Sequence, residues 1–187
     1  MIDSPDLART CVVGCSGAGK STLAKKLAAA LDAPHVELDS LYWRPGWEAT
    51  PTDEFRRRVA EAAAGERWVM CGNYHGKTGD LRLERATAVV WLDYPLRILL
   101  WRLLKRTARR VVSRENLWGT GNRETLATTF GSDSIFLWLF RTYRSHRRRY
   151  AELMHDPAYA GVRFMRLESP RETNAWLEQF ESGVALR

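Results

Sequence analysis

GCSGAGKS, residues Gly14–Ser21, fits the pattern G-x-x-x-x-G-K-[ST] at every fixed position. Glycines at these spacings allow the backbone to curl until successive N–H groups point inward at phosphate oxygens. The lysine then reaches the β- and γ-phosphates, and the hydroxyl of the last residue is placed to bind Mg²⁺. We therefore predict a nucleoside triphosphate site whose binding residues are Gly14, Ser16, Gly17, Ala18, Gly19, Lys20, Ser21 and Thr22, with Ser21 as a metal ligand.

Apolar segments and helix-forming segments alternate on both sides of this loop. Strands are predicted at Thr10–Gly14, His35–Leu38, Arg67–Cys71, Ala86–Leu92 and Val162–Leu167. Helices are predicted at Lys20–Leu31, from a Thr52 cap to about residue 64, from Pro95 to about Val112, from Ser134 to Met154 after a Ser132 or Asp133 cap, and from Pro170 onward. This alternation favours an α/β fold with a five-stranded parallel sheet covered by helices on both faces. Ligands of such a sheet bind at the carboxyl ends of its strands.

Length and composition indicate one globular domain over residues 1–187. Hydrophobic residues make up 45% and charged residues 27% of the chain, which excludes extensive disorder. No apolar run reaches the roughly 20 residues that span a bilayer, and the first ten residues lack a signal core. The three cysteines form no CxxC pair, which is typical of reduced thiols. We expect a cytoplasmic protein with no membrane partner.

Positive charge is concentrated in the middle of the chain. Residues 97–149 contain thirteen basic residues against three acidic ones, while the whole chain carries a net charge of +7. Such a segment predicts an anionic partner, which is a nucleotide, another phosphorylated substrate or a nucleic acid. A basic surface exposed only to solvent is the alternative. The chain contains no recognised nucleic-acid-binding module, so that partner has no motif to support it.

Several stretches resemble the P-loop nucleoside and nucleotide kinase group, which includes adenylate kinases and shikimate kinases. More closely, the chain resembles adenylate-kinase-like bacterial proteins labelled "DNA topology modulation protein". The stretches are GCSGAGKST (14–22), ELDSLYWRPGW (37–47), RWVMCGNY (67–74), DLRLERATAVVWLDYP (80–95) and RLESPRE (166–172). The resemblance implies an ATP-dependent phosphotransferase that uses Mg²⁺. It also implies a small lid at about residues 113–131 and an acceptor-binding helix at about residues 52–64.

The resemblance also implies roles for individual residues. Asp39, at the end of the second strand, would lie near Mg²⁺ and the acceptor hydroxyl. Arg102 and Arg106 match the helix that leads into the lid, where arginines stack on adenine or contact phosphates. Arg141 matches the helix after the lid, whose arginine binds the transferring phosphoryl group. The loop from Ser169 to Arg171 would contact adenine, so Ser169 and Arg171 join the nucleotide-binding set.

One position departs from the kinase pattern. Similar sequences end the third strand with Asp-Gly, whereas this chain has Cys71-Gly72. Asp93 ends an apolar run, but on the fourth strand, which leaves Asp39 as the expected acidic metal ligand. Two other functions stay open. One is an ATP-binding protein that acts on or with nucleic acid through the basic segment, and the other is a degenerate nucleotide-binding regulator. The sequence names neither the phosphoryl acceptor nor the oligomeric state.

Overall fold

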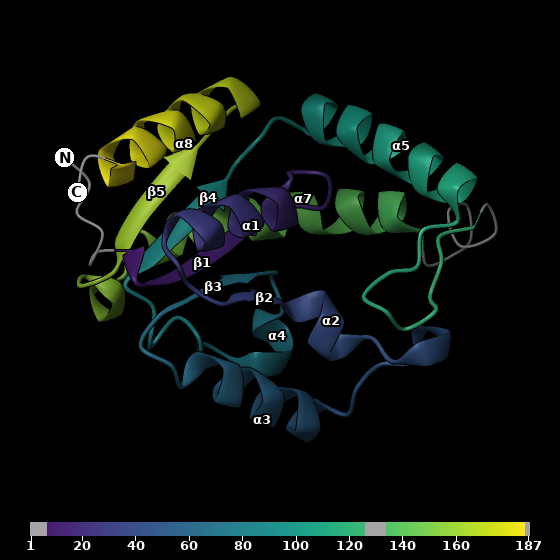
Figure 1. Cartoon of the computed structure of the whole chain (residues 1–187), viewed down its shortest axis with the longest axis horizontal. Coiled ribbons are helices and arrows are strands. Elements are labelled where there is room, and N and C mark those ends of the chain that lie inside the picture. The colour runs from purple at the N-terminus through teal and green to yellow at the C-terminus, as the bar shows by residue number, and fades with distance from the viewer. Residues whose placement is uncertain (1–6, 126–133, 186–187) are drawn as a thin grey trace.

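The computed structural model describes residues 7–125 and 134–185 of the chain. In chain order the elements are β1 (Arg9–Gly14), α1 (Lys20–Ala30), β2 (His35–Glu37), α2 (Leu38–Tyr42), η2 (Pro45–Trp47), α3 (Thr52–Ala63), β3 (Trp68–Cys71), α4 (His75–Thr78), β4 (Ala88–Leu92), α5 (Leu96–Ser113), α7 (Ile135–Leu153), η3 (Pro157–Tyr159), β5 (Arg163–Leu167) and α8 (Pro170–Ala185) (Figure 1). None of the helices in this part of the chain is long and apolar enough to cross a membrane.

The sheet has five strands in the order β2-β3-β1-β4-β5, and every pairing is parallel. The chain leaves β1, adds β2 and β3 on one side, and then continues with β4 and β5 on the other side. The carboxyl end of β1 therefore lies where the direction of winding reverses, which is where ligands bind in sheets of this kind. The predicted strand set and the predicted parallel sheet are confirmed.

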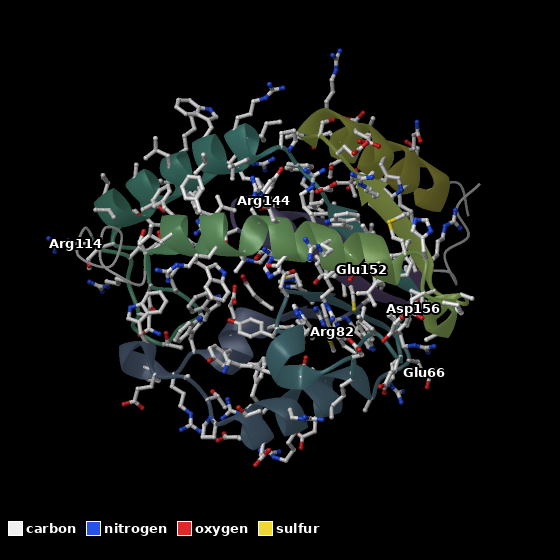
Figure 2. The ribbon with its side chains drawn as sticks, turned by 180° about the vertical axis from the view of Figure 1, so that it is seen from behind. Glu66, Arg82, Arg114, Arg144, Glu152 and Asp156 are labelled. Atoms are coloured by element: carbon white, nitrogen blue, oxygen red, sulfur yellow. The ribbon has the colours of Figure 1, made fainter. Side chains whose placement is uncertain are left out.

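Helices cover both faces of the sheet. The views from the front and from behind show α1 and α7 on opposite faces, with α8 beside β5 (Figures 1 and 2). One core cluster joins Val12 and Val90 to Leu27 of α1 and Phe180 of α8. A second cluster joins strand residues that point the other way to Tyr150 and Leu153 of α7. Alternate residues of β1, β3 and β4 are thus buried on opposite faces, which explains why these strands are continuously apolar in sequence.

Three predicted boundaries change in the structure. The second strand ends at Glu37, and Leu38 begins α2, so Asp39 lies in the first turn of a short helix rather than at a strand end. Thr52 is the first helical residue of α3, and Pro51 occupies the cap position. Ser134, rather than a preceding residue, caps α7 by accepting a hydrogen bond from the N–H of Phe136. The expected caps Ser132 and Asp133 lie outside the described residues.

Replacement of Gly14 by alanine tests the close approach of β1 to β4. Gly14 has φ +138°, and a Cβ atom there would lie 2.6 Å from the carbonyl oxygen of Leu92. Because the clash involves backbone, we expect Gly14→Ala to lower the free energy of unfolding by about 3 kcal/mol. Urea denaturation measures this change. Gly65→Ala is the control, since its Cβ would meet an ordinary contact at 3.7 Å. Equal stabilities of the two variants would contradict the prediction.

Candidate active site

The loop between β1 and α1 is shaped by close contact with α5. A Cβ atom at Gly17 would lie 2.6 Å from the carbonyl oxygen of Leu99, and one at Gly19 would lie 2.8 Å from Nη2 of Arg102. Gly19 precedes the first helical residue, Lys20, and no side chain caps this helix. The first N–H groups of α1 thus have no side-chain cap as an acceptor, and they can donate to an anion.

Lys20 lies over this loop in a largely buried position. Its Nζ donates a hydrogen bond to the carbonyl oxygen of Cys15 at 3.1 Å. Burial lowers the pKa of Lys20, and the carboxylate of Asp39 opposes that shift. The guanidinium of Arg106 also acts on this amine electrostatically, so α5 and α1 bring two cations to the same region.

Ser21, the expected metal ligand, has two polar neighbours, which lie at the carboxyl ends of β2 and β3. Its hydroxyl donates to Oε1 of Glu37 at 2.6 Å. Sγ of Cys71 lies 3.8 Å from the same hydroxyl and 3.6 Å from Nε2 of His35. Burial, followed by the charge of Glu37, raises the pKa of Cys71 to about 12, so this thiol is neutral at physiological pH. Glu37 was not predicted as a site residue. It stands two residues before Asp39, and this i, i+2 spacing of acids was the available signal.

Asp39 is positioned by an aromatic hydroxyl. The phenol of Tyr74 donates to Oδ1 of Asp39 at 2.5 Å. Burial raises the pKa of Asp39, while this hydrogen bond and the charge of Lys20 oppose the rise. The ring of Tyr74 packs on Tyr42 and on Phe55 of α3, the helix expected to bind the acceptor. The carboxylate therefore sits between the loop and α3.

The oxygen atoms around Ser21 fit a magnesium ion. Mg²⁺ takes oxygen ligands, and proteins usually bind it through one or two carboxylates together with substrate phosphates. Ser21 and Glu37 supply a hydroxyl and a carboxylate in direct contact, and Asp39 supplies a second carboxylate nearby. Across the described residues, no group of three or more His, Cys, Asp or Glu side chains could hold a metal ion by itself. This donor set suits an ion that arrives with a nucleotide.

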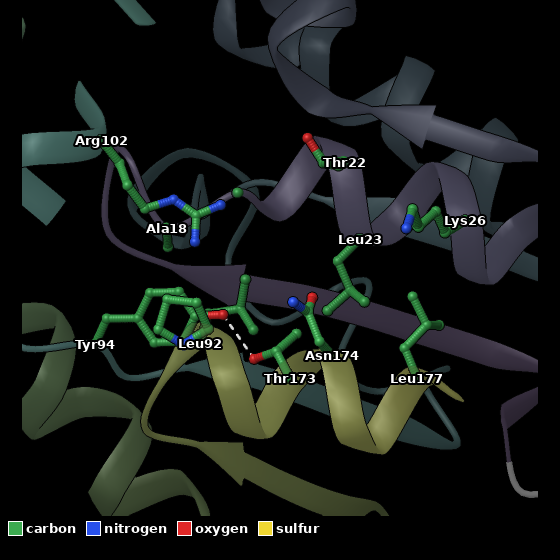
Figure 3. Close-up of a pocket in the computed structure, with 12 residues that line it drawn as sticks. Ala18, Thr22, Leu23, Lys26, Leu92, Tyr94, Arg102, Thr173, Asn174 and Leu177 are labelled. Carbon is green, nitrogen blue, oxygen red and sulfur yellow. Dashed lines mark hydrogen bonds between the residues drawn. The ribbon is translucent and has the colours of Figure 1, made fainter. Parts of the chain in front are cut away.

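Arg102 lines a pocket between the loop and the start of α8. Its guanidinium carbon lies 5.7 Å from the centre of the Tyr94 ring, and the Tyr94 hydroxyl is 2.6 Å from that of Thr173 (Figure 3). Gly19 and Pro170 also line this pocket. Ser169 and Arg171 are not among its lining residues. The Ser169 hydroxyl instead accepts a hydrogen bond from the N–H of Glu172. The structure thus brings Pro170 of the expected loop into the same pocket as Gly19 and Arg102.

Arg106 lies one turn further along α5 and close to the acids of the site. Its Nη2 is 3.5 Å from Oε1 of Glu124. Burial lowers the pKa of Arg106, and the carboxylates of Glu124, Asp39 and Glu37 oppose that shift. Its buried Nε has no hydrogen-bond partner among the described residues. An arginine held close to these carboxylates has a guanidinium group of the kind that binds phosphate.

Arg141 does not join this group. Leu139, His146 and Tyr150 form the buried face of α7, and Arg141 is exposed. At 100° per residue, Arg141 points about 140° away from His146 on the helix. The resemblance in sequence indicated the helix that carries Arg141 but not which face of that helix is turned towards the site. The role expected for Arg141 would need a movement of α7 that this structure does not contain.

Asn73, which follows β3, holds the start of the loop. Its Oδ1 accepts from the N–H of Gly14 at 3.2 Å, and its Nδ2 donates to the Gly14 carbonyl at 2.8 Å. Nδ2 also lies 3.1 Å from Nδ1 of His146, and the Tyr150 hydroxyl donates to Oδ1 at 3.2 Å. One amide therefore connects β1, β3 and α7. In the sequence, the turn Gly72-Asn73 after an apolar strand was the only signal for this role of Asn73.

Part of the expected lid is described, up to residue 125. Asn122 is buried; its side chain accepts from the N–H of Trp47 at 3.0 Å and donates to the carbonyl of Arg44 at 2.8 Å. Glu124 accepts from Arg110 of α5 at 2.8 Å. The segment after α5 thus spans from α5 to η2. Residues 126–131 of the expected lid lie outside the described part of the chain.

Asp93 is engaged in two ion pairs. Its buried carboxylate lies 2.6 Å from Nε of Arg147 and 2.6 Å from Nη2 of Arg166. These contacts join the end of β4 to α7 and β5. A carboxylate that is paired with two guanidinium groups stabilises the fold. This role agrees with the position of Asp93 after the fourth strand, away from the third strand, where similar sequences have an acid.

Comparison with known proteins gives one partial sequence match and a shared fold. No protein-family model matches the chain. The uncharacterized protein YqaC of Bacillus subtilis is 32% identical over 101 residues, which cover 53% of this chain and 56% of YqaC. This chain thus spans about half the length of that relative.

Two solved structures share the architecture over nearly the whole chain. Shikimate kinase from Acinetobacter baumannii in complex with shikimate has a TM-score of 0.56 and 18% identity, and covers 96% of this chain and 93% of its own. A gluconokinase from Sinorhizobium meliloti 1021 has a TM-score of 0.50 and 20% identity, and covers 96% of this chain and 97% of its own. The chain has the P-loop kinase fold. The narrower resemblance to proteins labelled for DNA topology modulation stays a prediction.

Removal of the Asn73 amide tests its hold on the loop. Asn73→Ala leaves the N–H and carbonyl of Gly14 without these partners, and we expect a loss of about 3 kcal/mol in the free energy of unfolding. Hydrogen exchange at the Gly14 amide should accelerate as well. Asn116→Ala is the control, because that side chain accepts one exposed hydrogen bond, from the N–H of Gly121. Unchanged exchange at Gly14 would show that the amide does not hold the loop.

His146 predicts a specific pH dependence. Burial, followed by the charge of Lys20, lowers its pKa to about 4 in the folded protein. Between pH 6.5 and 4 the unfolded chain then binds more protons at this residue, so stability falls as the pH falls through that window. We expect protonation of His146 in the unfolded chain to lower the free energy of unfolding by about 2 kcal/mol between pH 7 and pH 5. Urea denaturation at both pH values should show a smaller loss for His146→Gln, and an identical loss in the variant would contradict the assignment.

Proposed function

We propose that this chain transfers the γ-phosphoryl group of ATP to a hydroxyl or phosphate group of a small molecule. One observation carries the proposal: Lys20, Asp39 and Arg106, from three different elements, act on one another electrostatically beside the start of α1. Phosphoryl transfer needs positioning and neutralisation of charge rather than covalent chemistry from the protein. Two cations and an acid around a phosphate-binding loop meet that need.

Each of these groups has a distinct task in the proposed reaction. The free N–H groups at the start of α1 bind phosphate oxygens, and Lys20 neutralises charge on the β- and γ-phosphates. Arg106 binds the transferring group, because a guanidinium fork matches phosphate oxygens. Asp39 orients the acceptor hydroxyl and accepts its proton. The raised pKa of Asp39 makes it a better base than an exposed carboxylate.

The nucleotide and the metal ion are assigned to separate parts of the site. Ser21, Glu37 and Asp39 would hold Mg²⁺, which neutralises phosphate charge when bound. Arg102 would stack on adenine, and Ser169–Arg171 would contact it through the backbone. The buried thiol of Cys71 lies beside Ser21 at the position where similar kinases have an acid, and in this proposal Glu37 takes over the acidic role at that edge of the sheet.

The acceptor would bind between Asp39, Tyr74 and α3. A phosphate-transfer screen with ATP and Mg²⁺ tests this, using nucleosides, nucleotides, shikimate, gluconate and related hydroxylated acids as acceptors. The two solved structures named above are a shikimate kinase and a gluconokinase, so shikimate and gluconate belong in the screen. Formation of a phosphorylated product in step with ADP supports the proposal. ATP binding with no product from any acceptor would favour a nucleotide-binding regulator.

Substitutions on α1, α5 and α7 separate the proposed roles. We expect Lys20→Ala to lower kcat at least about a hundredfold with the fold intact, because it removes charge from the transferring group. Arg106→Lys should lower kcat about tenfold or more, since lysine lacks the fork. Arg141→Lys is the matched control and should change kcat less than about twofold, because Arg141 is exposed on the far side of α7. Full activity in Arg106→Lys with loss in Arg141→Lys would reverse the assignment and indicate that α7 turns during the reaction.

A further inference from the structure

The outer face of α5 carries large apolar side chains that the fold does not cover. Trp101, Leu104 and Val112 are 59%, 51% and 85% exposed. Their spacing of three and eight residues places them on one face of the helix. The buried residues Leu99 and Leu103 lie on the opposite face. This helix therefore has two apolar faces, of which the core uses one.

Basic side chains flank the exposed face of α5. Arg97, Lys105 and Arg109 are exposed on or beside it, and Nζ of Lys105 lies 4.8 Å from the centre of the Trp101 ring. The helix contains six basic residues and no acidic one over Leu96–Ser113. Apolar contact area and positive charge thus occur together on one surface.

The first turns of α7 extend this character. Both ribbon views show α7 running beside α5 (Figures 1 and 2). Leu137, Trp138 and Phe140 are 43%, 53% and 53% exposed. Arg144, labelled in Figure 2, is exposed further along α7, as is Arg148. Trp138 and Phe140 point about 160° apart, on either side of the buried Leu139, so they lie on two sides of the exposed part of α7. The exposed face of α5, with its flanking bases, and these neighbouring exposed side chains of α7 are together called the α5–α7 surface.

We propose that the α5–α7 surface attaches this protein to bilayers that contain anionic phospholipids. Tryptophan, phenylalanine and leucine beside arginine and lysine are the set that inserts at the boundary between headgroups and acyl chains. Three large apolar side chains exposed on one face of α5, beside three more on the first turns of α7, are more than isolated surface residues, which are normal in any protein. The surface lies outside the proposed active site. Its attachment needs no membrane-spanning segment, so the expectation of no membrane partner is revised for contact at the bilayer surface.

Charge argues against a second copy of this chain as the occupant. A symmetric dimer through the outer face of α5 would bring Arg97, Lys105 and Arg109 against the same three residues of the other copy, and α5 has no acidic residue to pair with them. Aliphatic side chains argue against nucleic acid. Single-stranded nucleic acid binds through aromatic stacking and positive charge, to which Leu104 and Val112 contribute nothing. An anionic lipid surface satisfies both the apolar and the basic groups.

Vesicle flotation with the full chain tests the proposal. The probes are vesicles of phosphatidylcholine alone and of phosphatidylcholine with an equal part of phosphatidylglycerol. We expect at least about tenfold tighter binding to the mixed vesicles, and weakening by added salt, because several basic residues act together near an anionic surface. Leu104→Asp should lower binding about tenfold, and Trp101→Gln several-fold, since both remove apolar area. Both residues are exposed, and thermal unfolding verifies that the variants fold.

Charge reversal on two helices supplies the matched control. Arg97→Glu, on the α5–α7 surface, should weaken binding to the mixed vesicles about tenfold, whereas Lys25→Glu, exposed on α1, should leave it unchanged. Equal effects of the two charge reversals would overturn the proposal. Equal binding to both kinds of vesicle, or no binding to either kind, would overturn it as well. A dimer detected by light scattering, and dissociated by Leu104→Asp, would also overturn the proposal. The same holds if the protein binds oligothymidylate instead of vesicles and Trp101→Gln weakens that binding. ATP-dependent phosphate transfer does not enter these readouts, so they stand or fall separately from the proposed function.

Discussion

The hydrogen bonds from the Asn73 side chain to both polar groups of the Gly14 backbone are the contact on which the site depends. β1 ends at Gly14, and the loop and the start of α1, with Lys20 and Ser21, follow directly from where the chain turns next. The same amide is bound by Tyr150 and lies against His146, so α7 fixes Asn73 while Asn73 fixes the loop. A half-buried side chain with partners on β1 and α7 adopts one conformation, because moving it would leave several polar groups unpaired. The loop is therefore preformed.

Close packing of α5 against the loop also fixes the loop conformation. The backbone of α5 approaches the loop until no side chain fits at Gly17, and Arg102 fills the space that a Cβ at Gly19 would need. The loop and α5 therefore form one packed unit, with Arg102 and Arg106 on the side of α5 that faces the loop. Polar groups bring Lys20, Ser21, Glu37 and Asp39 together at the carboxyl edge of the sheet. Burial is the largest cause of the pKa shifts of Lys20 and Asp39, and in each case the opposite charge of the other group opposes the shift.

The basic segment divides into three groups with different environments. Arg102 and Arg106 face the loop. Arg147 and Arg149 are paired with Asp93 and Asp80. Arg141, Arg144 and Arg148 point outward on α7. A net charge counted along the chain cannot separate these groups, because residues one position apart on a helix point about 100° apart. The same arithmetic explains why Trp101 and Leu104 are exposed although the core residue Leu103 lies between them.

The sequence by itself determined the five parallel strands, the five longer helices and the glycine-rich loop between β1 and α1. The loop pattern is local, and the strands are apolar throughout because both faces of the sheet are buried. Tertiary structure alone decided that Glu37 meets Ser21, that Asn73 meets Gly14, and that Arg141 turns outward. Those outcomes depend on the relative placement and rotation of elements that are distant in sequence. Local pattern specifies which segments form elements, whereas packing of the finished core decides which side chains of those elements meet.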